Sequence, residues 1–335
     1  MRNLLSLAIG VLALSCALWA GDLRRIAMVD LPGEPGFDSI AMANGNLVIA
    51  HSAANTVDIF NMPRRRLIAQ IKNIPGASGV AVDAQGGRVY LSSKTSPGIY
   101  VVAMHDWSVE NTIPTDAPVD TMLFSASAGK LFLSSEVAQI ITAVDVAHGN
   151  FQQKLNVQGL PQGMAFDPEQ KLLFVALGDQ AQVIGIDPAM QIVKRFALHG
   201  SQPTGVAFDV AEHSLFVAVR SAVVELNAAT GAEMGRVTAE PGVDSLWLDG
   251  SSRTLYAESG HKVQVIRVAG GRLADATESS IDVRGEGLAF DPSTNLVYVP
   301  GGREGKSKLL ILKQLGTRNQ SLAQENESGP QVATR

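Results

Sequence analysis

Residues 161–168 read PQGMAFDP, and residues 203–210 read PTGVAFDV at the same point in a recurring pattern of apolar runs. Seven copies of this short segment occur along the chain, and neighbouring copies are 40 or 42 residues apart. The central residues of the copies are Ala41, Ala81, Leu123, Ala165, Ala207, Trp247 and Ala289. A period of this length, kept from one end of the chain to the other, is typical of a repeat architecture.

Each period contains four short apolar runs that are separated by turn residues. In residues 203–239 the runs are GVAFD, SLFVAV, AVVELN and AEMGRVTA. Runs of this length, rich in Val, Leu and Phe and bounded by Gly, Asn and Asp, indicate strands joined by tight turns. Four antiparallel strands per period and seven periods predict an all-β fold, a seven-bladed β-propeller. An Asp ends most first runs, and we expect it to cap the next turn: Asp83, Asp167, Asp209, Asp249 and Asp291.

The two ends of the repeat region complement each other. The seventh period supplies only three apolar runs before the polar tail that starts at Gly316. A fourth run, RRIAMVDL, precedes the first period at residues 24–31. We expect this amino-terminal strand to complete the last blade, because a closed ring leaves no open sheet edge. The prediction is one domain over residues 21–315, followed by a disordered polar tail at 316–335.

The first residues have the features of an export signal. Arg2 precedes an apolar run from Leu4 to Ala20, and the polar sequence GDLRR follows. This order predicts a signal peptide at residues 1–20 and a periplasmic or secreted protein. An uncleaved amino-terminal anchor and lipidation at Cys16 stay open as alternatives. We expect no membrane span in the mature chain.

Composition excludes several classes of function. The formal net charge is −5 and the isoelectric point is about 5.7, so the chain lacks the basic field that nucleic-acid binding requires. Cys16 is the single cysteine of the sequence and lies within the predicted signal. A mature chain without cysteine has no disulfides, no thiolate catalysis and no covalent haem. We expect a monomer.

Residues 47–61, 172–190 and 215–237 share the order of strand, small polar turn, strand and Asp or Asn turn. In this order the three stretches resemble the YVTN family of exported seven-bladed propellers. The resemblance covers the repeat region and implies a propeller that binds a ligand or a partner protein outside the cytoplasm. Related seven-bladed groups include lactonases and haem-binding propellers, so the resemblance does not fix one function.

The residue two positions before the apolar pair of each repeat is the main candidate for function. We call these seven positions the rim slot: Asp38, Ser78, Asp120, Gln162, Thr204, Asp244 and Glu286. In a propeller they lie at the mouth of the central channel. The carboxylates Asp38, Asp120, Asp244 and Glu286 predict a site for a divalent cation such as calcium, or an acid/base pair. The structural alternative is that they accept backbone hydrogen bonds at crowded strand starts.

The loops between second and third strands reach the same face. Their polar residues are His51, Lys94, Glu136, Asp179, Arg220, Glu258, His261 and Arg303. We therefore expect a protein or small-molecule ligand at the rim. The alternative is a lactonase-like hydrolase in which His51, His261 or Glu286 acts as the base. Single histidines in surface loops are more often solvated than catalytic. A non-covalent redox cofactor in the channel is the third alternative.

Overall fold

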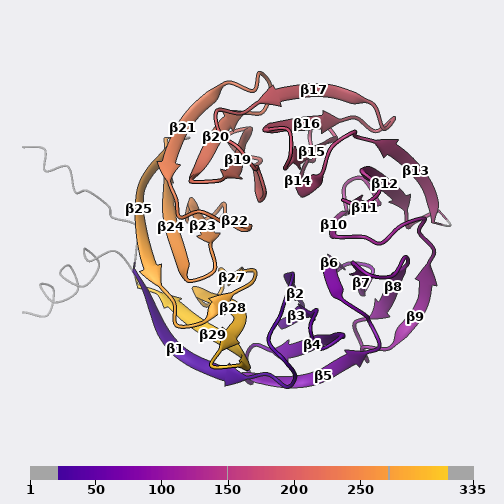
Figure 1. Cartoon of the computed structure of the whole chain (residues 1–335), viewed down its shortest axis with the longest axis vertical. Helices are drawn as coiled ribbons and strands as arrows, with labels where there is room; N and C mark the ends of the chain where they lie inside the picture. The colour runs from indigo at the N-terminus through magenta and orange to yellow at the C-terminus, as the bar shows by residue number, and fades with distance from the viewer. Residues whose placement is uncertain (1–21, 149, 271, 316–335) are drawn as a thin grey trace, which may run out of the picture.

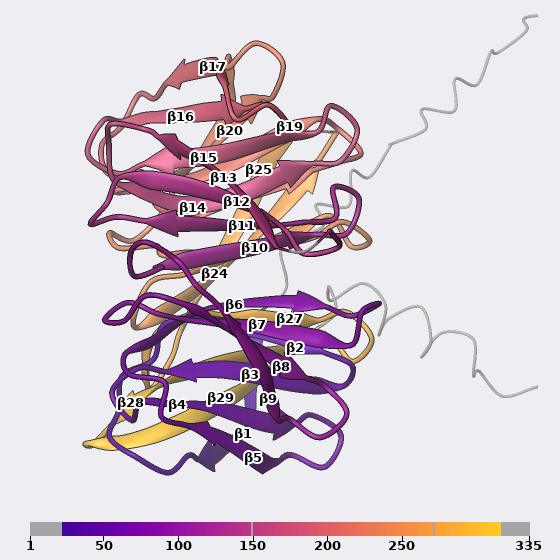
Figure 2. The same ribbon diagram turned by 90° about the vertical axis from the view of Figure 1, so that its right-hand side faces the viewer.

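The computed structural model describes residues 22–148, 150–270 and 272–315. These residues form seven antiparallel sheets arranged in a ring, and they contain no helix (Figure 1). The first strands of the blades lie around the centre, and the fourth strands form the outer circumference. Seen from the side, the turns and loops gather on two opposite faces of the ring (Figure 2). The predicted seven-bladed β-propeller is confirmed.

Blades 1 to 3 each contain four consecutive strands. Blade 1 contains β2 (Ile40–Ala43), β3 (Asn46–His51), β4 (Thr56–Asn61) and β5 (Arg66–Lys72). Blade 2 contains β6 (Ala77–Asp83), β7 (Arg88–Ser93), β8 (Ile99–Ala103) and β9 (Val109–Ile113). Blade 3 contains β10 (Thr121–Ser125), β11 (Lys130–Ser135), β12 (Ile140–Asp145) and β13 (Phe151–Asn156).

Blades 4 to 6 follow the same order. Blade 4 contains β14 (Pro161–Asp167), β15 (Leu172–Leu177), β16 (Gln182–Ile186) and β17 (Ile192–Ala197). Blade 5 contains β18 (Val206–Asp209), β19 (Ser214–Val219), β20 (Ala222–Asn227) and β21 (Glu233–Thr238). Blade 6 contains β22 (Ser245–Asp249), β23 (Thr254–Glu258), β24 (Lys262–Ala269) and β25 (Arg272–Ser280).

Blade 7 is built from both ends of the described chain. Its inner strand is divided into β26 (Arg284–Gly285) and β27 (Ala289–Asp291), which both pair with β28 (Leu296–Arg303). The next strand, β29 (Lys306–Gln314), pairs antiparallel with β1 (Leu23–Asp30) from the amino-terminal end. This pairing confirms that an amino-terminal strand completes the last blade. The predicted signal at residues 1–20 and the predicted tail at 316–335 lie outside the described residues.

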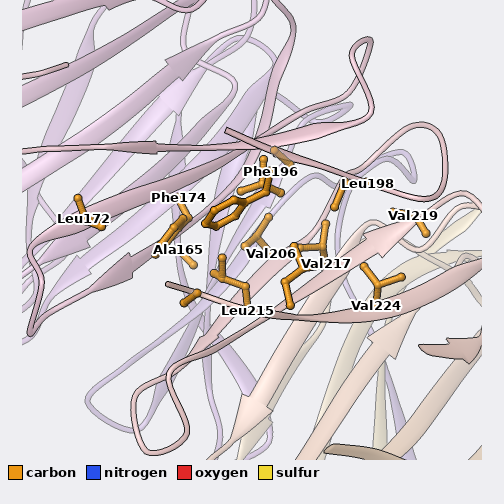
Figure 3. Close-up of a cluster of buried hydrophobic side chains, with 14 of the residues drawn as sticks. Ala165, Leu172, Phe174, Phe196, Leu198, Val206, Leu215, Val217, Val219 and Val224 are labelled. Atoms are coloured by element: carbon orange, nitrogen blue, oxygen red, sulfur yellow. The ribbon is translucent and has the colours of Figure 1, made fainter. Parts of the chain in front are cut away.

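One apolar cluster lies at each of the seven junctions between neighbouring blades. Second strands such as β15 and β19 are buried along their whole length, because a blade packs against neighbours on both faces. The junction of blades 4 and 5 contains Phe174, Phe196, Leu215 and Val217 (Figure 3). Stability therefore rests on packing that is repeated around the ring.

The Asp residues at the ends of first strands have the predicted capping role. Asp167 Oδ1 accepts hydrogen bonds from the amides of Glu169 (2.9 Å) and Gln170 (3.0 Å). Asp249 and Asp291 accept equivalent bonds from the amides of the turns that follow them. These carboxylates are held in turns and are not available at the channel.

Candidate functional site

The rim slot has a fixed backbone position. In five blades the slot amide donates to a carbonyl of the second strand: Asp38 to Ala50 (3.1 Å), Asp120 to Ser134 (2.9 Å), Thr204 to Ala218 (3.0 Å), Asp244 to Glu258 (3.2 Å) and Glu286 to Pro300 (3.0 Å). Because the same ladder bond recurs, the backbone is equivalent from blade to blade while the side chain differs. Glu286 also occupies the interruption between β26 and β27.

Six of the seven slot residues line one cavity of about 810 Å³ at the mouth of the channel, which we call the rim cavity. The exception is Ser78, whose buried Oγ donates to the carbonyl of Val119 at 2.8 Å. Lys94 and Glu136, from loops between second and third strands, also line the cavity. Arg284, which sequence reasoning missed, lines it from the start of β26. The structure thus brings the chemically variable position of the repeat onto one concave surface.

The rim cavity is acidic. Its five carboxylates are Asp38, Asp120, Glu136, Asp244 and Glu286, and its two cationic groups are Lys94 and Arg284, which gives a formal charge of −3. Lys94 is already paired, since its Nζ lies 2.7 Å from Asp38 Oδ2. The negative charge therefore exceeds what the cations of the cavity itself can balance.

The carboxylates are unevenly distributed around the rim. Blades 6, 7 and 1 are consecutive and contribute Asp244, Glu286 and Asp38, which we call the acidic arc. Blades 4 and 5 contribute Gln162 and Thr204, which are neutral. In the acidic arc, Glu286 Oε2 accepts a hydrogen bond from the Phe37 amide. The Asp244 carboxylate has no hydrogen bond or ion pair within the described residues. Within the acidic arc, the Asp244 carboxylate is thus the group with oxygen atoms available to a bound cation.

Glu258 lies behind the wall of the acidic arc. It ends β23 and is 1% exposed, and its Oε2 accepts a hydrogen bond from the Gly287 amide at 3.2 Å. Its Oε1 has no partner in the described structure. A Cβ atom added at Gly285 would come within 2.6 Å of this Oε1, so glycine is required there. Burial raises the pKa of Glu258 to about 7.

Burial also perturbs the carboxylates that line the rim cavity. It raises the pKa of Asp38, although the hydrogen bond from Lys94 acts in the opposite direction. It raises the pKa of Asp244, and the nearby charge of Asp38 adds to this effect. It raises the pKa of Glu136 together with the charge of Asp120. For Lys94, burial opposes the charged form, but the hydrogen bond and charge of Asp38 outweigh it and raise the pKa. The site therefore favours an added positive charge.

His51, a candidate base in the sequence, is buried and does not line the rim cavity. Its Nδ1 lies 2.9 Å from Asp58 Oδ2, and its Nε2 lies 2.7 Å from the Glu34 carbonyl oxygen. Its ring stacks on Phe37, with the ring centroids 4.2 Å apart. Phe37 does line the cavity. His51 therefore supports the segment that presents Phe37 and Asp38 at the rim.

The remaining predicted rim residues lie outside the cavity lining. His261 is exposed, and its Nδ1 lies 3.1 Å from the Val283 carbonyl oxygen. Asp179 Oδ1 accepts a hydrogen bond from the Leu160 amide at 2.8 Å. Arg303 pairs with Asp282 at 2.8 Å, and Arg220 is exposed. The loops reach the predicted face, but these side chains do not converge on the channel.

The four slot carboxylates do not form a coordination cluster. Within the residues that the structure describes, no group of three or more His, Cys, Asp or Glu side chains is close enough to hold a metal ion. The carboxylates instead surround a cavity of organic-ligand size. The predicted calcium site at Asp38, Asp120, Asp244 and Glu286 gains no support from this geometry.

Solved structures share the arrangement of the blades. Hydrazine synthase of Kuenenia stuttgartiensis is similar over 86% of this chain and 98% of its own, with 12% identity and a TM-score of 0.73. Virginiamycin B lyase from Staphylococcus aureus is similar over 88% of this chain and 100% of its own, with 10% identity and a TM-score of 0.73. The Cps50 (Swd1) β-propeller domain of Myceliophteria thermophila is similar over 88% and 100%, with 9% identity and a TM-score of 0.71. The likeness concerns the fold alone.

No protein-family model matches the sequence, and no curated protein matches it significantly. The part of the chain that the structure describes has no helix long and apolar enough to cross a lipid bilayer.

Proposed function

We propose that this protein is a binding propeller whose rim cavity takes a ligand with a positively charged organic group. The observation that carries the proposal is the formal charge of −3 on the lining of one cavity of about 810 Å³. Desolvated carboxylates gain more from a bound ammonium or guanidinium group than they would in water, because the local dielectric constant is lower. The Asp244 carboxylate, which has no partner in the described structure, is the expected anchor.

The ligand size follows from the volume of the rim cavity. Clefts of roughly 300–1,000 Å³ hold small molecules in many proteins. A polyamine, or a lysine or arginine side chain of a partner protein, has the required charge and can enter from the open rim face. Phe37 supplies an apolar wall beside the acidic arc, which suits the methylene groups of such a ligand.

The hydrolase alternative has one supporting observation. Glu258 is buried behind the wall of the acidic arc with its pKa raised to about 7, and the charges of Asp244 and Glu286 contribute to this shift. The structure places both candidate histidines outside the cavity lining, so Glu286 is the remaining residue of the candidate bases that faces a ligand. Hydrolysis of a lactone panel that is lost in Glu286→Gln would favour this alternative over simple binding.

We also propose that the protein works outside the cytoplasm as a member of the YVTN type of propeller. The support is the predicted signal at residues 1–20 and the similarity of residues 47–61, 172–190 and 215–237 to that family. Fractionation of cells that express the full chain, together with the amino-terminal sequence of the mature protein, tests this proposal. A mature protein that starts at Met1 in the cytoplasm would contradict it.

The binding proposal is tested by calorimetric titration of spermidine at low ionic strength and pH 7.5. We expect the double variant Asp244→Asn, Glu286→Gln to weaken spermidine binding roughly 10-fold or more, because two charge-assisted contacts are lost. The matched control is Glu169→Gln, Glu212→Gln, which removes the same charge from exposed turns on the opposite face. Equal losses in both double variants would mean that net charge alone attracts the probe, and the proposal would fail.

A further inference from the structure

A second cavity lies at the junction of blades 3 and 4, and we call it the interblade pocket. It has a volume of about 200 Å³, and its apolar walls are Phe132, Phe166, Leu173, Ile186 and Met190. The other lining residues, apart from Lys130, belong to turns that join first to second and third to fourth strands. In an antiparallel blade those turns lie at the end away from the rim slot, so the pocket opens on the opposite face of the ring.

The junction of blades 4 and 5 provides a comparison one period further along the chain. Between blades 4 and 5, Phe174 and Phe208 take the places of Phe132 and Phe166 one period earlier. A third ring, Phe196, packs against Phe174 with centroids 6.1 Å apart (Figure 3). Register assigns Leu155 to the position of Phe196, because Leu155 pairs with Ile141 as Phe196 pairs with Val183. The cluster between blades 3 and 4 has two phenyl rings in place of three.

Two cations accompany this difference in packing. Lys130 and Lys171 line the interblade pocket, whereas Leu172 and His213 occupy the equivalent positions one period later. His213 is paired with Glu169 at 3.2 Å. Neither lysine of the pocket has a carboxylate partner in the described structure, and Lys130 Nζ contacts only the Gln153 amide oxygen at 3.1 Å. Lys130 is half-buried and Lys171 is exposed, so the two lysines lie at the mouth of the pocket and not in its apolar interior.

The one carboxylate of the lining does not neutralise these lysines by an ion pair. Asp187 Oδ1 accepts hydrogen bonds from the amides of Ala189 (3.0 Å) and Gln191 (2.9 Å), which holds it as a turn cap. The pocket therefore combines an apolar interior with a net positive mouth.

We propose that the interblade pocket binds a small amphipathic carboxylate, with an aromatic or branched apolar body inside and the carboxylate between Lys130 and Lys171. The volume fits this class, because apolar cavities of roughly 150 Å³ bind benzene. A pocket of about 200 Å³ holds one phenyl ring with a short chain. This site is independent of the rim cavity and of its proposed cationic ligand.

The test compares three probes with the same phenylpropyl body: 3-phenylpropionate, 3-phenylpropanol and 3-phenylpropylamine. Binding to the full chain is followed by calorimetry and by ligand-observed NMR. We expect the carboxylate to bind best and the amine worst in the interblade pocket. In Lys130→Met, Lys171→Met, carboxylate affinity falls roughly 10-fold while alcohol affinity is unchanged, since methionine keeps the apolar stem. Similar affinity of the carboxylate and the alcohol for the wild type would overturn the proposal, and the variant Asp244→Asn, Glu286→Gln removes amine binding at the rim cavity from the comparison.

A blocking variant separates loss of the site from loss of the fold. Ala128 lines the pocket from the turn before β11, so Ala128→Phe places a ring over its mouth without entering a strand. We expect this variant to lose binding of 3-phenylpropionate and to keep the thermal midpoint and the spermidine affinity of the wild type. Retained binding of 3-phenylpropionate in Ala128→Phe would place the probe elsewhere and would also overturn the proposal.

Discussion

The rim cavity and the interblade pocket are two products of the same repeat, and they differ in how they arise. The rim cavity is formed where seven equivalent backbone positions meet, and its acidity comes from which side chains occupy them. The interblade pocket lies between two blades and is accompanied by changes in side-chain size and charge relative to the next junction. One site is large, polar and acidic, while the other is small, apolar and basic at its mouth. In both sites the chemical properties come from side chains that differ between equivalent positions of the seven repeats.

The largest effect is expected from removing His51, which supports the segment that presents Phe37 and Asp38 at the rim cavity. His51→Ala deletes a buried ring and leaves Asp58 with one fewer partner. We expect a loss of roughly 3 kcal/mol or more in the free energy of unfolding, because breaking a buried pair leaves a polar group unsatisfied. Urea unfolding measures this change.

The matched control is His261→Ala, which removes the other candidate histidine from an exposed loop and should change stability by less than about 0.5 kcal/mol. We expect the interblade pocket to keep its affinity for 3-phenylpropionate in both variants. If His51→Ala were as stable as the wild type, the structural role assigned to His51 would be wrong.

A second experiment uses pH to change the rim cavity without changing the interblade pocket. The pKa of Glu258 is raised from 4.5 to about 7, so the folded protein keeps a proton that the unfolded chain loses between these pH values. The free energy of unfolding should therefore fall by roughly 3 kcal/mol as the pH rises from 4.5 through 7. Glu258→Gln should flatten this fall and be more stable than the wild type at pH 8.

The same ionisation should change ligand binding at the rim. A negative charge on Glu258 adds to the acidic arc, so spermidine should bind the wild type more tightly above pH 7 and bind Glu258→Gln with a weaker dependence on pH. Urea unfolding and calorimetry at pH 5 and pH 8 provide both readouts. A wild-type protein whose stability is the same at the two pH values would contradict the assignment.

The smallest effect is expected from a substitution that makes the rim cavity more negative and leaves the interblade pocket unchanged. Lys94→Met removes the cation that pairs with Asp38, so more negative charge is left for a ligand. We expect spermidine affinity to rise about 5-fold, which corresponds to about 1 kcal/mol for a partly exposed pair. Calorimetry measures the change, and Lys154→Met, which unpairs an exposed Asp116, is the control with the same charge. A fall in spermidine affinity in Lys94→Met would contradict the role of Lys94 as a cation that competes with the ligand for Asp38.

The sequence predicted the parts of the rim cavity that depend on the period. Because the repeat fixes the backbone at each slot, Asp38, Asp120, Asp244 and Glu286 could be placed at the channel mouth without coordinates. The loop residues could be placed on the correct face of the ring, but the direction in which each side chain points could not be predicted. Glu136 lines the rim cavity. Asp179 instead accepts a hydrogen bond from the Leu160 amide, and Glu258 is buried behind the cavity wall.

Other features could not be predicted from the repeat. Arg284 lies two residues before a slot position, and its approach to the cavity depends on the interruption of the inner strand of blade 7. His51 appears in the sequence as a loop histidine, but its partners Glu34 and Ser307 come from distant segments. The interblade pocket depends on how side chains of two blades fill a shared volume, and packing of this kind is not encoded in a local pattern.

The pairing of β1 with β29 has a consequence for the order of folding. These strands stand at opposite ends of the described chain, and Asp30 pairs with Lys308. A chain that emerges from the ribosome can form its middle blades early, but its first strand must wait unpaired until the last one has been made. Contacts of such long sequence separation form slowly, because a large loop must close first. Closure of the ring is therefore expected to be a late, post-synthetic step, and until then the strand edges of β1 and β29 are open to pairing with other chains.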